Sequence, residues 1–181
     1  MIPQRYGWLK NLYQPLLVQH GFDLWGTTEI PGPKSNPEIM AWAKALKVEQ
    51  TYTNDDIAWC GLFMGYVVHK SGRKPVPNLL RARAWASWGA GVDLTKDKAS
   101  LGDVLVFERG PVYGHVGIYI AEDQSTYYVL GGNQSNTVNV TRIQKSRLIA
   151  VRRPIYNVKP WTAKPYWVND TTGVLISTNE A

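Results

Sequence analysis

Hydrophobic residues in the first part of the chain recur at steps of three and four, the spacing of one face of an α-helix. One such face runs over residues 6–18, and Pro15 is expected to break it because proline cannot continue helical hydrogen bonding. A second runs over residues 37–46, behind Asn36 as the capping residue. The pattern therefore predicts two helical segments before residue 50.

A third helical segment contains the single cysteine of the chain. It is expected to begin with Asp55 or Asp56 as its N-cap and to run to about His69. The sequence Lys70-Ser71-Gly72 follows, and a cation in the last turn with a glycine beyond it is typical of a helix end. Residues 81–89 predict one more short helix, which a glycine ends.

Beyond residue 100 the pattern changes to short runs of apolar, β-branched and aromatic residues separated by turn residues. These runs predict five strands, at residues 104–107, 115–121, 126–130, 137–143 and 148–152. Helices followed by consecutive short strands indicate an α+β fold, in which the N-terminal helices pack on an antiparallel sheet of about five or six strands.

The length of 181 residues suits one domain with a substantial core. We expect that domain to span residues 1–153, followed by a C-terminal tail, residues 154–181, that is rich in proline and aromatic residues at its start. No run reaches the roughly 20 apolar residues of a membrane span, and the N-terminal sequence lacks the pattern of a secretory signal. We expect a soluble monomer that needs another factor for any export.

The formal charge of +6 and the isoelectric point near 9.4 favour polyanionic partners, such as nucleic acid, anionic lipid or the acidic polymers of a bacterial wall. No nucleic-acid motif and no dense basic cluster with interleaved aromatic residues is present, so no nucleic-acid partner is expected. One cysteine and three histidines give no zinc-ligand spacing. We therefore expect chemistry without a metal or other cofactor.

Cys60 is the candidate nucleophile. It lies near the start of the third predicted helix, where unpaired backbone N–H groups and the helix dipole favour a thiolate. Tyr52 and Asn54 precede it and are candidate partners of the Cys60 N–H in binding an oxyanion. The alternative is a buried, inert cysteine, because cysteine is among the most buried residue types.

His115 is the candidate base. It follows a turn and opens a predicted strand, which places its ring at the rim of the sheet, and Gly117 leaves space on the same face. His20 lies in a loop before a glycine, and His69 ends a helix as a cation matched to the dipole, so neither needs a catalytic explanation.

A catalytic imidazole needs a third polar group that fixes its tautomer and orientation. Asn133 is the first candidate, because it follows Leu130-Gly131-Gly132 at the end of the strand next to His115. A hairpin would bring its amide towards the ring. Gln134 is the second candidate, and a simple turn asparagine is the alternative.

With these residues in view, the chain resembles the Cys/His amidohydrolase/peptidase (CHAP) domains of the NlpC/P60 papain-like group. The resemblance rests on four strings in the family's order, and it covers about residues 8–153; the strings are Trp59-Cys60-Gly61-Leu62-Phe63, Gly102-Asp103-Val104-Leu105-Val106-Phe107, Gly114-His115-Val116-Gly117-Ile118-Tyr119 and Val129-Leu130-Gly131-Gly132-Asn133-Gln134. Together with Glu29-Ile30-Pro31-Gly32 and Asn36-Pro37, the order looks closest to small phage and bacterial members.

The resemblance implies a papain-like fold and hydrolysis of an amide bond in bacterial peptidoglycan, by an amidase or a peptide endopeptidase. By motif it matches Cys60 to the nucleophile, His115 to the base and Asn133 to the orienting residue. Many CHAP domains carry a glutamate two positions before that asparagine, where this chain has Gly131. It further implies a phage lysin made in the host cytoplasm that acts on the cell wall after release.

Two other functions fit the sequence, and nucleic-acid binding driven by the basic charge is a weaker third possibility. A Cys/His hydrolase could act on an amide outside the wall, and a non-catalytic wall-binding or structural phage protein could keep the fold with Cys60 buried. Rapid labelling of the thiol near neutral pH would count against the second of these.

Overall fold

The computed structural model describes residues 2–168 and 176–177, so part of the predicted tail, residues 169–175 and 178–181, and Met1 lie outside the described residues. The described helices are three α-helices and three 3₁₀-helices: η1 (Gln4–Asn11), α1 (Leu16–Asp23), α2 (Pro37–Ala45), α3 (Cys60–Lys70), η2 (Ala82–Ser87) and η3 (Lys145–Arg147). No helix of the described residues is long and apolar enough to cross a membrane.

The strands form one antiparallel sheet of six strands in the order β1-β6-β2-β3-β4-β5. Their bounds are β1 (Ala90–Gly91), β2 (Val104–Arg109), β3 (Tyr113–Glu122), β4 (Thr126–Gly131), β5 (Asn139–Gln144) and β6 (Leu148–Arg153). The α+β prediction and all five predicted strands are confirmed. The sequence pattern does not predict the two-residue β1, because within the described residues it pairs with β6, about 60 residues away.

Alternate residues of the strands fill two hydrophobic clusters, one on each face of the sheet. The face towards the helices includes Val104, Val106, Val116, Ile118 and Leu130. The opposite face carries a smaller cluster, which includes Leu105, Phe107, Tyr119, Val129 and Val151. Side chains alternate across a strand, so burial of both sets explains why these runs are continuously apolar.

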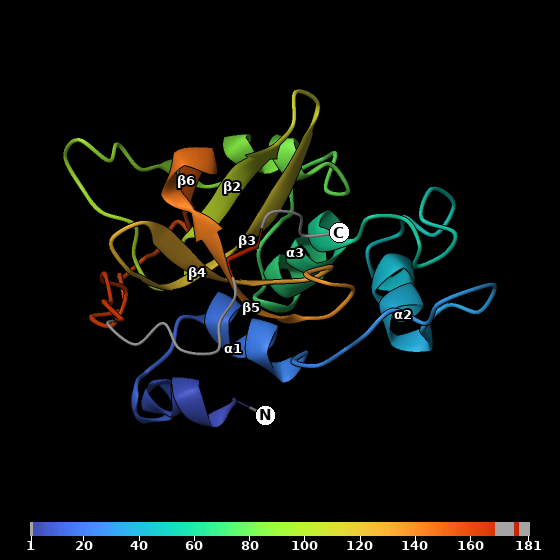
Figure 1. The fold of residues 1–181 in the computed structure, drawn as a ribbon, viewed down its shortest axis with the longest axis horizontal. Helices are drawn as coiled ribbons and strands as arrows, with labels where there is room; N and C mark the ends of the chain where they lie inside the picture. Colours follow the sequence, from blue (N-terminus) through green and yellow to red (C-terminus); the bar gives the residue numbers. More distant parts are fainter. Residues whose placement is uncertain (1, 169–175, 178–181) are drawn as a thin grey trace.

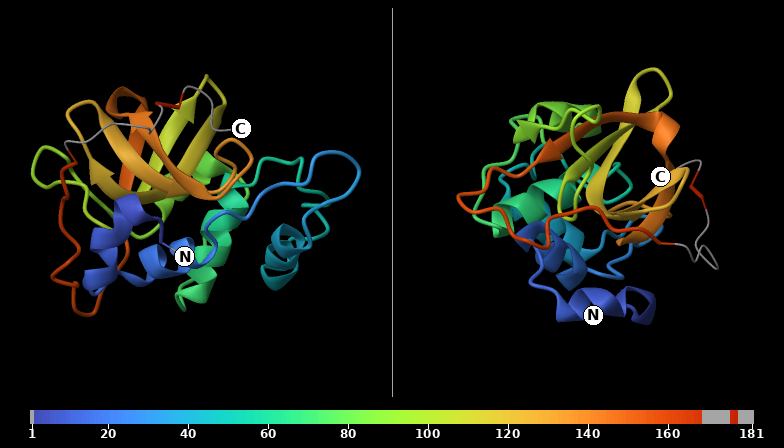
Figure 2. Two further views of the ribbon diagram at one scale, coloured as in Figure 1. Left: turned by 60° about the horizontal axis from the view of Figure 1, so that its bottom comes forward. Right: turned by 90° about the vertical axis from the view of Figure 1, so that its left-hand side faces the viewer.

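Helices α1 and α3 cover one face of the sheet, and α2 stands further from it beside α3 (Figures 1 and 2). The Trp42 ring of α2 stacks on Tyr66 of α3, with ring centroids 5.5 Å apart. Asn36 caps α2 as predicted, since its side chain accepts a hydrogen bond from the Glu38 N–H at 2.8 Å. The predicted segment over residues 6–18 is broken as expected, but its first part is a 3₁₀-helix that already ends at Asn11. Pro15 is the N-cap residue of α1, which begins directly after it.

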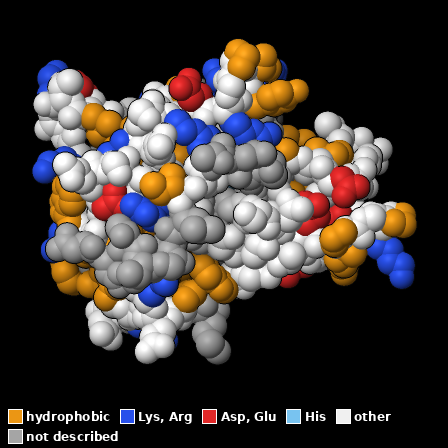
Figure 3. Space-filling model, viewed as in Figure 1, with side chains coloured by type: hydrophobic (Ala, Val, Ile, Leu, Met, Phe, Trp, Pro, Cys, Tyr) orange, Lys and Arg blue, Asp and Glu red, His pale blue; other side chains and the backbone are white. Residues whose placement is uncertain are grey.

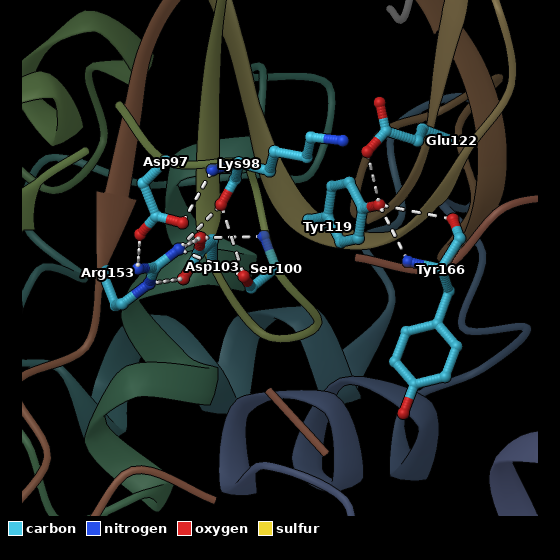
Figure 4. Close-up of polar contacts among 8 residues, drawn as sticks. All are labelled: Asp97, Lys98, Ser100, Asp103, Tyr119, Glu122, Arg153 and Tyr166. Atoms are coloured by element: carbon cyan, nitrogen blue, oxygen red, sulfur yellow. Dashed lines mark hydrogen bonds and ion pairs between the residues drawn. The ribbon is translucent and has the colours of Figure 1, made fainter. Parts of the chain in front are cut away.

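A buried ion pair ties the beginning of β2 to the end of β6 (Figure 4). Asp103 is fully buried and accepts hydrogen bonds from Arg153 Nε at 3.0 Å and Arg153 Nη2 at 2.8 Å. Burial raises the pKa of the Asp103 carboxyl, and the Arg153 guanidinium opposes that rise. The pair holds the start of β2 beside the end of β6, and β2 runs from there towards the candidate site.

The described part of the tail lies against the domain. Thr162 Oγ1 donates to the Tyr13 carbonyl, and the Leu101 N–H donates to the Lys164 carbonyl at 3.0 Å. Tyr119 also accepts a hydrogen bond from the Tyr166 N–H on its hydroxyl (Figure 4). These contacts join residues 160–168 to the N-terminal segment and to β3; the division at residue 153 stays a prediction.

Candidate active site

Cys60 is the first residue of α3. Trp59 occupies the N-cap position, and the Phe63 N–H makes the first helical hydrogen bond, to the Trp59 carbonyl at 2.9 Å. The N–H groups of the turn before Phe63 therefore lack intrahelical acceptors, and the positive end of the helix dipole lies there. The Cys60 side chain is 7% exposed, so a thiolate there would meet the helix terminus with little competing water.

The predicted helix start at Asp55 or Asp56 is wrong. The Asp55 carboxylate instead accepts hydrogen bonds through Oδ2 from the Ile30 N–H at 3.0 Å and the Asn36 N–H at 2.8 Å. Asp55 is buried and connects the segment before α2 to the segment before α3. A cap at Asp56 would place Cys60 in the first turn or just past it, whereas Cys60 is the first residue of the helix and lies closest to the positive end of the helix dipole.

Gly61 allows a close approach of another segment to this helix start. A Cβ at this position would collide with the Leu79 carbonyl oxygen and lie 2.8 Å from the Leu80 carbonyl. The backbone of residues 79–80 therefore passes directly beside the residue that follows the cysteine. Any larger residue at position 61 would push this segment away.

His115 lies near the start of β3, opposite Phe107 of β2. Its side chain is 2% exposed, and its Nε2 lies 3.0 Å from Gln134 Oε1. Gly117 is required for a different reason from the expected one: a Cβ there would lie 2.8 Å from the Leu130 carbonyl of β4. Glycine at this position lets the two strands approach each other beside the site.

The Gln134 amide is fixed on its other side, and this determines the tautomer of the histidine. Gln134 Nε2 donates to the Asn139 carbonyl at 2.7 Å and to the Val129 carbonyl at 3.2 Å, so Oε1 is the atom that faces the ring. An oxygen can only accept, so His115 Nε2 must carry the proton. The lone pair of the neutral ring is then on Nδ1, the nitrogen that can take a proton from a thiol.

Asn133, the first candidate for the orienting residue, is buried and adopts a left-handed backbone conformation with φ of 56°. The hydrogen bond to the His115 ring comes from its neighbour Gln134, the second candidate. No hydrogen bond of the Asn133 side chain is found among the described residues. Its assignment as the third catalytic residue stays a prediction.

Gly132 brings the histidine side of the site to the cysteine side. A Cβ on Gly132 would lie 2.6 Å from Phe63 Cβ and 2.6 Å from Trp59 Cζ3. These two residues flank Cys60 at the start of α3. Gly131 is less tightly enclosed: a Cβ there would lie 2.8 Å from Gln134 Oε1 and 3.1 Å from His115 Nε2. The Gly131-Gly132 pair therefore lies between the His115 ring and the two residues that flank Cys60.

A pocket of about 540 Å³ opens beside Cys60. Its walls come from the segment before α3, the segment 78–84 and the β2–β3 turn, and it is lined by Ile57, Ala58, Cys60, Asn78, Leu80, Arg81, Ala82, Arg83, Ala84, Arg109, Val112, Tyr113 and Gly114. Gly114 directly precedes His115, so the pocket reaches the backbone next to the candidate base. Its size is typical of sites that hold a small ligand or a few residues of a longer substrate.

Of the two candidate oxyanion donors, Tyr52 makes a hydrogen bond within the protein. The Tyr52 hydroxyl donates to the Ile57 carbonyl at 3.2 Å and holds the loop before Cys60. Burial, together with the nearby Asp55 carboxylate, raises the Tyr52 pKa, so the phenol stays protonated. The Asn54 side-chain oxygen is buried without a hydrogen-bond partner among the described residues. The N–H groups at the start of α3 are the better-placed donors.

Glu29 also belongs to this region, and no local sequence pattern indicates its partner. Trp59 Nε1 donates to Glu29 Oε2 at 3.2 Å, which ties the loop before α2 to the N-cap of α3. A contact over 30 residues between a loop acid and an indole has no local sequence signal.

In residues 2–168 and 176–177, no group of three or more His, Cys, Asp or Glu side chains is arranged to hold a metal ion.

The comparisons with known proteins bear directly on this arrangement. Residues 51–133 match the family model of the CHAP domain. The match supports a CHAP-type hydrolase over this part of the chain. CHAP domains are papain-like cysteine/histidine amidases or peptidases that act on peptidoglycan. A search of curated proteins found no match to the chain.

The CHAP match includes Cys60 and His115 and ends at Asn133, one residue before the glutamine that contacts the ring. It begins at Thr51, so α1, α2 and the loop that carries Glu29 lie outside it, as do β5 and β6. The papain-like order of a helix that begins with cysteine and a strand that begins near histidine is therefore present in full within the match.

Proposed function

We propose that this protein hydrolyses an amide bond of bacterial peptidoglycan with Cys60 as nucleophile and His115 as base. The observation that supports this most strongly is the convergence at the start of α3: the Gly131-Gly132 turn packs on the residues around the cysteine, and the same turn leads into the glutamine bonded to the histidine. A buried inert cysteine would require neither the oriented imidazole nor the pocket beside it.

In the first half of the reaction, His115 Nδ1 takes the thiol proton, and the Cys60 sulfur attacks the carbonyl carbon of the scissile amide. The negative charge on the carbonyl oxygen is stabilised by N–H groups at the start of α3. The C–N bond then breaks, and the imidazolium gives its proton to the leaving nitrogen. The products at this stage are a free amine and a thioester on Cys60.

In the second half, His115 takes a proton from water, and the resulting hydroxide attacks the thioester carbon. The C–S bond breaks, the product leaves as a carboxylic acid that releases its proton to solvent, and the thiolate recovers a proton from the imidazolium. Gln134 keeps the ring in one tautomer through both halves. The bond cut is either the link between muramic acid and the first alanine or a bond within the stem and cross-bridge peptides.

The test is fragment release from purified peptidoglycan in the presence of EDTA, with mass spectrometry of the soluble products. Wild type should release fragments whose masses identify the bond, and Cys60→Ala and His115→Ala should not. His69→Ala is the matched histidine control, because His69 lies exposed in the last turn of the same helix. If wild type and all variants were equally inactive on several wall types, a wall-binding protein would be favoured instead.

We further propose that the protein is a phage lysin, made in the host cytoplasm and acting on the wall after release. The support is the likeness of its motif order to small phage members. The basic charge would speed encounter with an anionic wall, and Lys and Arg side chains lie at several separate places on the face in Figure 3. Expression inside bacteria should cause lysis only when the inner membrane is permeabilised; lysis without permeabilisation, or none in either case, would contradict this.

A further inference from the structure

The pocket beside Cys60 carries an excess of positive charge. Three of its lining residues are arginines, Arg81, Arg83 and Arg109, and no acidic residue is among its lining residues. A cleft lined by one sign of charge, with low-dielectric walls, concentrates its field on a bound group of opposite sign. The remaining walls include the apolar side chains of Leu80 and Val112.

Two of the three arginines are occupied by the protein itself. Arg83 Nε donates to the Tyr113 carbonyl at 2.8 Å, and Arg83 Nη2 donates to the Gly110 carbonyl at 2.7 Å, so this guanidinium holds the β2–β3 turn in place. Arg109 lies over the ring of Tyr113, with its guanidinium carbon 5.9 Å from the ring centroid. Both shape the wall of the pocket.

Arg81 differs from them. Its side chain is exposed and lines the pocket, and within the described residues no hydrogen bond or ion pair engages its guanidinium. The position is nevertheless fixed, since the Arg81 N–H donates to the Asn78 carbonyl at 2.9 Å and η2 begins at the next residue. A fixed backbone with an unengaged guanidinium at the mouth of a pocket is suited to bidentate binding of a carboxylate.

We propose that Arg81 binds a free carboxylate of the substrate, so that the enzyme selects amide bonds with such a group nearby. This inference rests on the proposed function and deepens it, because peptide stems of the wall contain carboxylates that exist in free or amidated form. A carboxamide has one oxygen acceptor and no charge, so it forms a weaker contact with guanidinium. Arg81 is therefore a specificity-determining residue, separate from the residues that break the bond.

The experiment compares soluble muropeptides with free stem carboxylates and the same muropeptides converted to carboxamides with carbodiimide and ammonia. Wild type should cleave the free form with a KM about tenfold lower and a similar kcat. Arg81→Gln should remove this preference by raising the KM of the free form only, and Arg81→Lys should restore part of it. Lys70→Gln is the control for charge alone, because Lys70 is exposed at the opposite end of α3.

Binding of the same two muropeptides to Cys60→Ala, with and without Arg81→Gln, separates this inference from the proposed function. Tighter binding of the free form that depends on Arg81, without cleavage by wild type, would support the carboxylate site and contradict the hydrolase. Cleavage of both forms at equal KM by wild type and Arg81→Gln would support the hydrolase and overturn the carboxylate site. Absence of binding to either form would overturn both.

Discussion

Replacement of Gln134 by alanine tests how the histidine is held. Gln134 is 2% exposed, and its side chain joins His115 Nε2 at 3.0 Å to the Asn139 carbonyl at 2.7 Å. Alanine would leave a buried ring N–H and a half-buried carbonyl without these partners. At roughly 1 kcal/mol or more for each, the free energy of unfolding should fall by about 2–3 kcal/mol.

The same change should reduce kcat about 100-fold or more, because the imidazole would lose the contact that selects its tautomer. KM should change little, since the Gln134 side chain makes its hydrogen bonds to protein groups away from the pocket lining. Stability is measured by urea unfolding, and kcat by the rate of new amino groups released from soluble muropeptides.

Gln134→Glu separates orientation from stability. A carboxylate still accepts the hydrogen bond from His115 Nε2, but it cannot donate to the Asn139 carbonyl. This variant should recover part of kcat while remaining destabilised. If kcat instead followed the free energy of unfolding across both variants, Gln134 would have a structural role only.

Asn133→Gly is the matched control one position earlier. Glycine tolerates the φ of 56° found there, so the turn keeps its shape while the side chain is lost. If Gln134 orients the ring, Asn133→Gly should keep kcat within about twofold, because a side chain without a catalytic contact contributes little to the barrier. A 100-fold loss in Asn133→Gly with an unaffected Gln134→Ala would refute the reasoning and support Asn133.

Two further predictions concern packing and pH. Gly132→Ala should lower the free energy of unfolding by about 1–3 kcal/mol and reduce activity, because the added methyl would lie 2.6 Å from both Trp59 and Phe63. Urea unfolding measures the stability, and the muropeptide assay measures the activity. A variant with unchanged stability and activity would contradict the close packing. Burial raises the pKa of the Asp123 carboxyl. Hydrogen bonds from Thr126, Ser125 and Arg142 outweigh that effect and lower the pKa from 3.8 to about 2. A carboxyl pKa that is lower in the folded state than in the unfolded state stabilises the fold above pH 4 by about 2 kcal/mol. This stabilisation is lost as the pH falls towards 2. Asp123→Asn should therefore lose about that much at pH 7 and show a flatter decline of stability between pH 5 and 2, whereas an unchanged acid decline would contradict the assignment.

Local signals predicted the parts of the fold that depend on neighbouring residues. The end of α3 at Lys70 follows from a cation in the last turn and Gly72, which adopts a φ of 74°. The start of α3 depends on distant groups instead. Asp55 has the chemistry of an N-cap, but its carboxylate accepts hydrogen bonds from the N–H groups of Ile30 and Asn36. Sequence alone cannot rank the backbone N–H donors that compete for one carboxylate.

The candidate site likewise combines residues that local signals predict with contacts between distant segments that they do not predict. Cys60 and His115 could be selected because each stands beside glycines at the start of a predicted element, and the structure places both beside the pocket or its adjoining backbone. The choice between Asn133 and Gln134 depends on the backbone angles of one turn, which reverse the direction of successive side chains. The role of Glu29 depends on a contact between loops, for which the sequence has no periodic pattern.

The most direct test of the central claim is to trap the acyl-enzyme. Wild type would be mixed with soluble muropeptides, quenched in acid within the first turnovers, and examined by intact-mass and peptide-map mass spectrometry. The account predicts an adduct on Cys60 that equals the acyl part of the cleaved amide and disappears as the substrate is consumed, with no adduct on Cys60→Ala. Cleavage at the wild-type rate by Cys60→Ala, or an adduct on any other residue, would contradict it.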